Sequence, residues 1–131
     1  MTTPLWCLAL VAFLPFVWAP FAAVARRQQL GSVDNKLPRL QQAQLTGRGA
    51  RALGAHQNAF EALAVFTAVV VIAHLAGADP VWSARLALAF VAARITHGVT
   101  YLLDLDIARS TSWLVGQACA IGLLVLAARA G

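Results

Sequence analysis

The chain has 131 residues, of which 60% are apolar and only 11% are charged, and its formal net charge is +5. Soluble domains are about 45–50% apolar and about 25% charged, so this chain has too few charged side chains to cover a soluble globule. Nucleic-acid binding needs many basic residues on a solvated face, which this apolar composition does not offer. The composition therefore excludes a disordered chain, argues against a soluble enzyme or nucleic-acid partner, and indicates an integral membrane protein with a single domain over residues 1–131.

The first apolar segment, residues 4–25, contains no charged residue. Its 22 residues would span about 33 Å as a helix, enough to cross the hydrocarbon core of a bilayer. Pro15 and Pro20 are tolerated because neighbouring helices can satisfy the freed backbone groups. A cleaved signal peptide is the alternative, but no Lys or Arg precedes the segment and it is long for such a peptide. We therefore predict a retained membrane helix.

The second segment is basic. Residues 26–51 hold six basic residues and one acid, so they carry the whole net charge of +5, and the other four arginines are balanced by four acids. Gly31, Pro38 and Gly47 interrupt any periodicity, which predicts a basic loop over 26–47 with short helical pieces. By the positive-inside rule this loop faces the cytoplasm, and both termini face away from it.

Three more helices are predicted in the rest of the chain, over about 48–76, 81–103 and 110–128. A tight turn at 77–80 places Pro80 at the start of the third helix, and an acidic turn at 104–108 precedes the last one. The predicted fold class is all-α, a bundle of four transmembrane helices. Cys7 and Cys119 lie in apolar runs and are expected to be buried reduced thiols, with no spacing typical of a disulfide or a metal site.

Polar residues of three segments fall at one expected membrane depth, near the cytoplasmic side. One face of the second predicted helix carries Arg51, Gly54, Asn58 and Glu61 at helical spacing. One face of the third carries Arg94, His97 and Tyr101. Arg109 and Ser110 lie at the start of the last helix. Ionisable residues within a bilayer are costly and mark functional sites. Because arginine binds carboxylates through its planar fork, the cluster is suited to a small zwitterionic or anionic ligand.

A purely structural interpretation of the same residues stays open. Glu61 can pair with Arg94 to hold two helices together, and Asn58 can form an interhelical hydrogen bond worth about 0.6–2 kcal/mol. His56 can be a solvated side chain, and Tyr101 an anchor at the membrane interface. Small residues spaced four apart in the last helix, such as Gly116 and Ala120, favour close helix contact and self-association.

Two runs resemble the MAPEG family, the membrane-associated proteins of eicosanoid and glutathione metabolism. They are Arg51-Ala-Leu-Gly-Ala-His-Gln-Asn-Ala-Phe-Glu61 and Arg94-Ile-Thr-His-Gly-Val-Thr-Tyr101, the second followed by Arg109 and Ser110. The segment Asp34-Asn-Lys-Leu-Pro-Arg39 is similar to the small bacterial branch of that family.

The resemblance implies a homotrimer of four-helix subunits in a bacterial inner membrane, with glutathione as co-substrate between subunits near the cytoplasmic face. It implies that Arg51, His56, Asn58, Glu61, Arg94, His97 and Tyr101 bind glutathione, and that Arg109 and Ser110 activate its thiol. A nearby arginine favours the thiolate, which is the nucleophilic form. Two positions depart from the pattern: Gly54 stands where catalytic relatives often have arginine, and Trp113 where some have tyrosine.

Three functions follow as hypotheses. The first is a glutathione-dependent transferase or peroxidase acting on a lipophilic small-molecule electrophile from the membrane lipids. The second is a non-catalytic lipid- or ligand-binding protein on the same scaffold. The third is a structural membrane protein whose polar cluster locks the trimer. Binding of glutathione separates the first from the other two.

Overall fold

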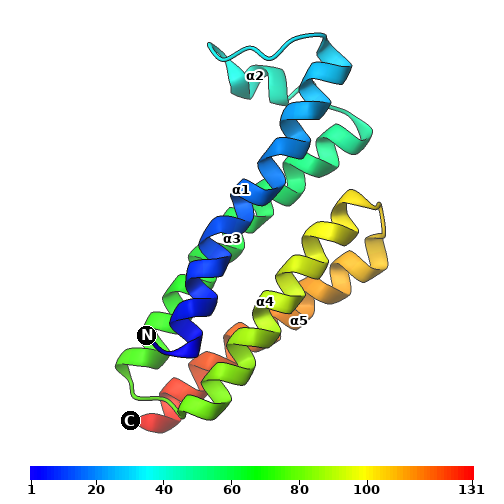
Figure 1. Ribbon diagram of the computed structural model, residues 1–131. Coiled ribbons are helices and arrows are strands. Elements are labelled where there is room, and N and C mark those ends of the chain that lie inside the picture. The colour runs from blue at the N-terminus through cyan, green and yellow to red at the C-terminus, as the bar shows by residue number, and fades with distance from the viewer.

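The computed structural model describes all residues, 1–131, and consists of helices and connecting turns without strands. Figure 1 shows α1 lying along α3 and α4 lying along α5, with the short α2 above them and both chain termini at the opposite end. We call these the loop end and the terminal end. The helices are α1 (Thr3–Leu30), α2 (Pro38–Gln42), α3 (Gly47–Leu75), α4 (Pro80–Leu102) and α5 (Asp106–Ala130).

Helix α1 continues past the predicted end at Ala25 to Leu30, so Arg26 and Arg27 are helical and the loop begins later than expected. Arginine is a good helix former, and a basic side chain in the last turn is favoured by the helix dipole. The helix ends where Gly31 adopts the left-handed conformation, with φ +75°, and donates its N–H to the Arg27 carbonyl oxygen at 3.1 Å. The charge pattern thus placed the end of this helix too early.

The turn between α3 and α4 agrees with the prediction. Pro80 begins α4, and the side chain of Asp79 caps it by accepting a hydrogen bond from the Trp82 N–H at 2.8 Å. Helix α5, in contrast, begins at Asp106 rather than at Ser110, because an acidic residue is favourable in a first helical turn. The predicted acidic turn over 104–108 therefore shortens to residues 103–105.

The main core lies in the half of the bundle nearer the terminal end. Phe66 of α3 and Phe90 of α4 stack at its centre with ring centroids 4.0 Å apart. Cys7 and Cys119 are both buried and free, as predicted. A smaller cluster, around Trp18 and two alanines of α3, lies nearer the loop end. The larger hydrophobic cluster does not reach the loop end, so polar side chains can be buried there.

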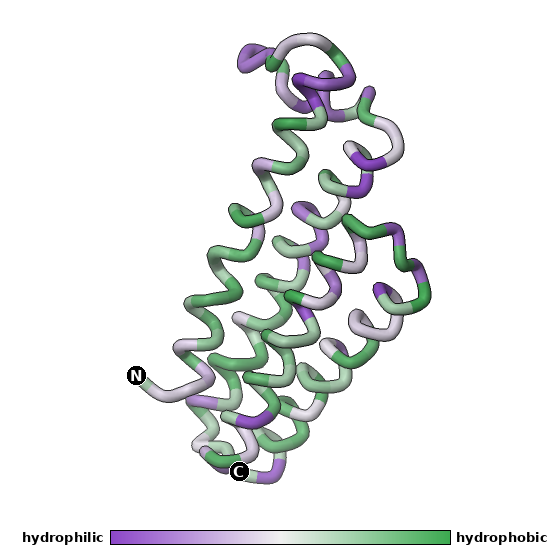
Figure 2. Tube along the Cα trace, turned by 45° about the vertical axis from the view of Figure 1, so that its right-hand side comes forward, coloured by the Kyte–Doolittle hydropathy of each residue, from purple (hydrophilic) through white to green (hydrophobic).

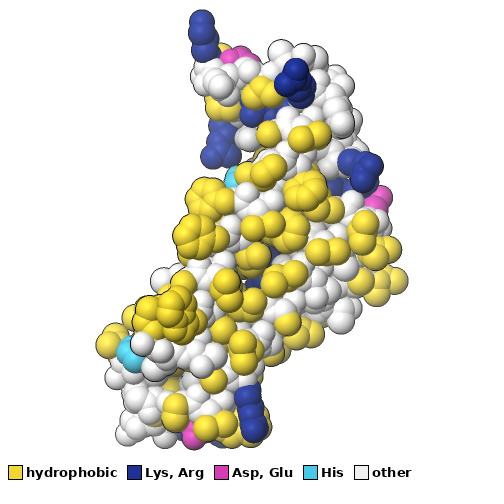
Figure 3. Space-filling view, viewed as in Figure 1, with side chains coloured by type: hydrophobic (Ala, Val, Ile, Leu, Met, Phe, Trp, Pro, Cys, Tyr) yellow, Lys and Arg dark blue, Asp and Glu magenta, His cyan; other side chains and the backbone are white.

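The outward faces of the helices are apolar. Large hydrophobic side chains are exposed along α1 and α5, and Figures 2 and 3 show the middle of the bundle dominated by hydrophobic residues while charged ones gather at the ends. Because such a surface is unfavourable in water, hydrocarbon is its natural solvent. Helices α1, α3 and α5 are long and apolar enough to cross a membrane.

Four membrane-spanning helices were predicted, and α4 is not among the three that qualify by length and composition. This helix carries Arg85 and Arg94, and it buries polar side chains such as His97 and Thr100 inside the bundle. The polar residues that lower its hydropathy therefore include Arg94, His97 and Thr100 in the interior of the bundle, whereas Arg85 is exposed.

Candidate functional site

Arg94 of α4 and Asn58 of α3 form the centre of the polar cluster at the loop end. Only 4% of Arg94 is exposed, and its Nη2 donates to the side-chain oxygen of Asn58 and to the Asn58 carbonyl oxygen at 3.4 Å. The Asn58 amide nitrogen in turn donates to the carboxylate of Glu61 at 3.1 Å. One amide thus connects a buried cation to an exposed carboxylate.

The direct pairing of Glu61 with Arg94 that the sequence allowed is not formed. Arg51 and Asp104 make the only salt bridge in the chain, and Asn58 stands between Arg94 and Glu61. The side chain of Arg94 therefore lacks a carboxylate partner, and its Nε is buried without any hydrogen-bond partner. A buried guanidinium in this state favours an anionic partner.

Arg109, Tyr101 and His97 form a second group, between α4 and α5. The Arg109 guanidinium lies 4.7 Å from the centre of the Tyr101 ring, and the His97 ring meets Tyr101 edge-on with centroids 5.6 Å apart. Such a cation–π contact contributes roughly 0.5–2 kcal/mol. The Arg109 side chain makes no ion pair, so its charge remains free for a ligand.

The backbone of Arg109 is held separately from its side chain. His97 donates from Nδ1 to the Arg109 carbonyl oxygen at 3.0 Å, and the Ser112 hydroxyl donates to the same oxygen at 2.8 Å. With the proton on Nδ1, the neutral imidazole has Nε2 as an acceptor, and this nitrogen is buried without a partner. This lone pair is a second unused polar group in the cluster.

Arg51 is tied to the turn between α4 and α5. Its Nη1 lies 3.1 Å from a carboxylate oxygen of Asp104, with 25% and 64% of the two side chains exposed. An ion pair this exposed contributes about 0–1 kcal/mol. The pair joins α3 to the turn that connects α4, which carries Tyr101, to α5, which carries Arg109.

His56 and Ser110 are the predicted residues for which no contact with the other predicted residues is seen, whether a hydrogen bond or an aromatic contact, and Arg51 is joined to the group only through Asp104. His56 donates from Nδ1 to the Pro15 carbonyl oxygen of α1 at 2.8 Å and meets Phe60 edge-on, so it is not simply solvated. Ser110 is exposed, and its hydroxyl has no hydrogen-bond partner. His56 joins α3 to α1, whereas Ser110 lies beside Arg109 on the outer surface.

Arg26 is a polar residue whose structural role the sequence did not reveal. It is 6% exposed, donating from Nε to Gln41 at 2.8 Å and from Nη2 to the Asp34 carbonyl oxygen at 2.7 Å. Its partners lie 8 and 15 residues away, so no local spacing could have indicated them. Arg26 fixes the connection between α1 and α2, away from the cluster.

The profile of the MAPEG family matches residues 3–129 of the 131-residue chain. The chain belongs to the MAPEG family. No curated protein matches it. Membership confirms the resemblance seen in the two sequence runs and identifies a membrane protein of a family concerned with glutathione-related transfer and lipid metabolism.

All nine predicted site residues of this MAPEG protein lie within the matched range. Three of them are arginines, and the acids that pair or hydrogen-bond with the predicted residues are Glu61, bonded to Asn58, and Asp104, paired with Arg51. The cluster therefore offers two guanidinium groups without ion pairs, one carboxylate beside an amide, and the free imidazole nitrogen of His97. This set complements a ligand with several anionic groups and one ammonium group.

Proposed function

We propose that this MAPEG protein is a membrane-embedded glutathione-dependent transferase or peroxidase that acts on lipophilic electrophiles. The observation that carries the proposal is that Arg94 and Arg109 are guanidinium groups without carboxylate partners, while the Glu61 carboxylate accepts a hydrogen bond from Asn58 and forms no ion pair. Glutathione carries two carboxylates, one ammonium group and a thiol. Glu61 matches the ammonium group, Arg94 matches one carboxylate, and Arg109 matches the thiolate.

Glu61 and Asn58 receive the ammonium group and backbone of glutathione in this proposal. Arg94 receives one of its carboxylates, and Arg51 receives the other by leaving its exposed ion pair with Asp104. Three uncharged residues position these groups. His97 offers Nε2 as an acceptor, and Tyr101 holds the Arg109 side chain. His56 fixes the face of α3 that carries Asn58.

Arg109 and Ser110 stabilise the thiolate. The cation offsets the negative charge of sulfur, and the exposed Ser110 hydroxyl donates a hydrogen bond to it. The thiolate attacks an electrophilic carbon, a carbon–sulfur bond forms, and the leaving group departs with its electron pair. With a lipid hydroperoxide, two glutathione molecules supply two electrons and two protons, giving the alcohol, water and glutathione disulfide.

The proposal includes the arrangement in the membrane. Helix α4 is the third crossing of four, since its 23 residues extend about 35 Å. The basic loop end faces the cytoplasm of a bacterial inner membrane, and both termini face away from it. Three subunits form a homotrimer, and the exposed Glu61 and Ser110 face a neighbouring subunit across the bound glutathione.

Calorimetric titration of the detergent-purified protein with glutathione tests the function. We expect saturable binding in the millimolar range or below, lost in Arg94→Gln and kept in Arg85→Ala, an exposed arginine near the other end of the same helix. Absence of binding at millimolar glutathione would overturn the proposal. Equal binding by Arg94→Gln and Arg85→Ala would remove Arg94 from the site.

A further inference from the structure

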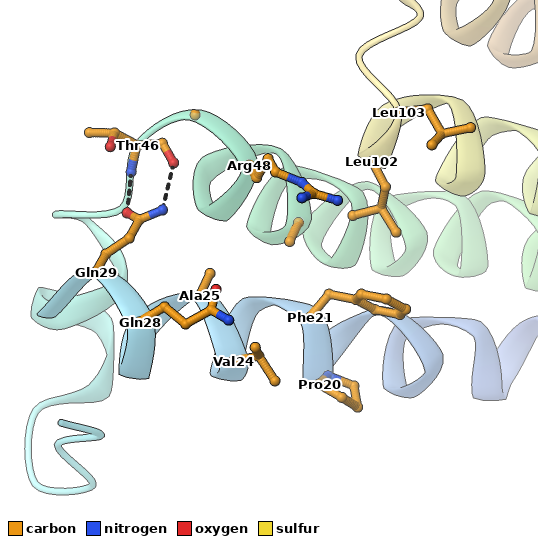
Figure 4. Close-up of a pocket in the computed structure, with 12 residues that line it drawn as sticks. Pro20, Phe21, Val24, Ala25, Gln28, Gln29, Thr46, Arg48, Leu102 and Leu103 are labelled. Atoms are coloured by element: carbon orange, nitrogen blue, oxygen red, sulfur yellow. Dashed lines mark hydrogen bonds between the residues drawn. The ribbon is translucent and has the colours of Figure 1, made fainter. Parts of the chain in front are cut away.

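A second candidate site lies at the loop end, between α1, the start of α3 and the end of α4. It is a pocket of about 770 Å³, within the range of about 300–1,000 Å³ typical of small-molecule sites. Figure 4 shows its lining residues drawn from these three helices. None of the nine residues of the glutathione cluster lines it.

The lining of this pocket is divided by polarity. Phe21 and Val24 of α1, Leu102 of α4 and Leu103 directly after it make an apolar wall. Gln28 and Arg48 lie among the polar residues of the lining. From Phe21 to Gln28 the helix rises about 10 Å, so the apolar part is followed by the polar part within one ligand's length.

The charge of the pocket has one sign. Arg48 is its only charged residue, no acidic residue lines it, and Arg48 forms no ion pair elsewhere in the protein. Its guanidinium extends from the start of α3 toward the end of α4 in Figure 4. An unpaired cation above an apolar wall complements a molecule with one anionic group and an apolar chain.

The polar end of the pocket is fixed by hydrogen bonds. Gln29 donates to the Thr46 carbonyl oxygen at 3.1 Å and accepts the Thr46 N–H at 3.0 Å, and both bonds are drawn in Figure 4. These two bonds tie the end of α1 to the residue that precedes α3. Arg48 therefore projects from a fixed backbone rather than from a free loop.

We propose that this pocket binds a free long-chain carboxylic acid, with its carboxylate on Arg48 and its chain along Phe21, Val24 and Leu102. The volume suits one aliphatic chain and is small for a phospholipid with two. The apolar outer surface of the helices places the pocket at the boundary of the bilayer, where such an acid dissolves. The site does not depend on glutathione.

Binding of radiolabelled laurate to the full chain in phosphatidylcholine nanodiscs, corrected with empty nanodiscs, tests this proposal. We expect saturable binding that is about tenfold tighter than that of dodecanol, since the charge-assisted hydrogen bonds are made only by the acid. Arg48→Gln removes that preference, and Val24→Trp, which fills the pocket, weakens both ligands. Arg27→Gln is the matched control, because Arg27 is exposed on α1 outside the pocket.

Equal binding of laurate and dodecanol would overturn the proposal, as would an equal loss in Arg27→Gln and Arg48→Gln, which indicates a general basic surface. Loss of laurate binding when phosphatidylglycerol is added to the nanodiscs would identify a phospholipid as the occupant instead. We expect Arg109→Ala to bind laurate normally without glutathione. Laurate binding thus tests the pocket, and glutathione binding tests the transferase proposal, so either proposal can fail without the other.

Discussion

The hydroxyl oxygen of Tyr101 lies directly against Gly54, where a Cβ atom would stand only 2.6 Å from it. Atoms do not approach so closely, so α3 needs glycine at this position for Tyr101 to keep its place beside Arg109. The family resemblance led us to expect an arginine at this position. In this chain Gly54 belongs to the packing that positions Tyr101.

Gly54→Ala should lower both the melting temperature and the affinity for glutathione. Alanine is better than glycine in a helix by about 1 kcal/mol. Overpacking against Tyr101 costs about 1–3 kcal/mol, and displacing that ring also loses a cation–π contact worth roughly 0.5–2 kcal/mol, so the losses outweigh the gain. Gly116→Ala is the control, because its Cβ would meet its nearest neighbour at an ordinary 3.5 Å and should leave stability unchanged or higher. Equal melting temperatures and equal glutathione binding in the two variants would contradict this account.

The close approach of α1 and α4 gives a prediction for stability alone. A Cβ at Gly98 would overlap the ring of Trp18, so Gly98→Ala should destabilise by about 1–3 kcal/mol, as overpacking does. Adding Trp18→Leu to Gly98→Ala should recover part of that loss. Thermal unfolding of the four proteins of this cycle measures the coupling, and strictly additive effects would argue against the contact.

Asn58→Leu should destabilise the protein by about 1.5–3 kcal/mol, because Arg94 then loses the side-chain oxygen that accepts its hydrogen bond. The double variant Asn58→Leu with Arg94→Leu should be more stable than Asn58→Leu alone, since it removes the unpaired buried charge as well. Detergent unfolding curves compare the two. A double variant weaker than the single one would show that Arg94 stabilises the fold without Asn58.

Arg109→Ala should abolish the ultraviolet thiolate absorbance of bound glutathione at neutral pH. The cation that stabilises the charged sulfur is removed, while the backbone bonds from His97 and Ser112 persist. Arg129→Ala, at the far end of the same helix, should keep the full signal and the same oligomeric state. A thiolate signal that survives in Arg109→Ala assigns the role to another group.

Labelling of single cysteines tests the orientation. Cysteine introduced at Arg39 in α2 should react only with a reagent that reaches the cytoplasm, and cysteine at Ala76 in the opposite turn only with one applied from outside. The native Cys7 and Cys119 are buried and should stay unlabelled in the folded protein. The opposite labelling pattern would invert the proposed topology.

The helices and the polar cluster could be predicted because their signals are local. Apolar length, Pro80 and the spacing of Asn58 and Glu61 need only neighbouring residues to be interpreted, and the structure places Arg94 and Asn58 together as that spacing indicated. The end of α1 was misplaced because Arg26 was interpreted by its charge, although its burial depends on partners beyond the helix.

What the sequence left undetermined depends on contacts between helices. Opposite charge at one depth favoured a direct bond of Glu61 with Arg94, but only the packed helices show that Asn58 occupies the space between them. The pocket proposed to bind a long-chain carboxylic acid could not be predicted from the sequence, because its wall joins Val24 with Leu102, which are 78 residues apart. Such a surface exists only after α1, α3 and α4 have assembled.

The two hydrogen bonds that reach the Arg109 carbonyl oxygen hold that position through its backbone, and the side chain contributes nothing to them. Any residue placed at 109 would therefore emerge from the same point of α5, in the same direction from the bundle. Exchange of this side chain can alter the chemistry of the loop end while the scaffold stays intact. The position is thus a natural place for relatives with one architecture to diverge in activity.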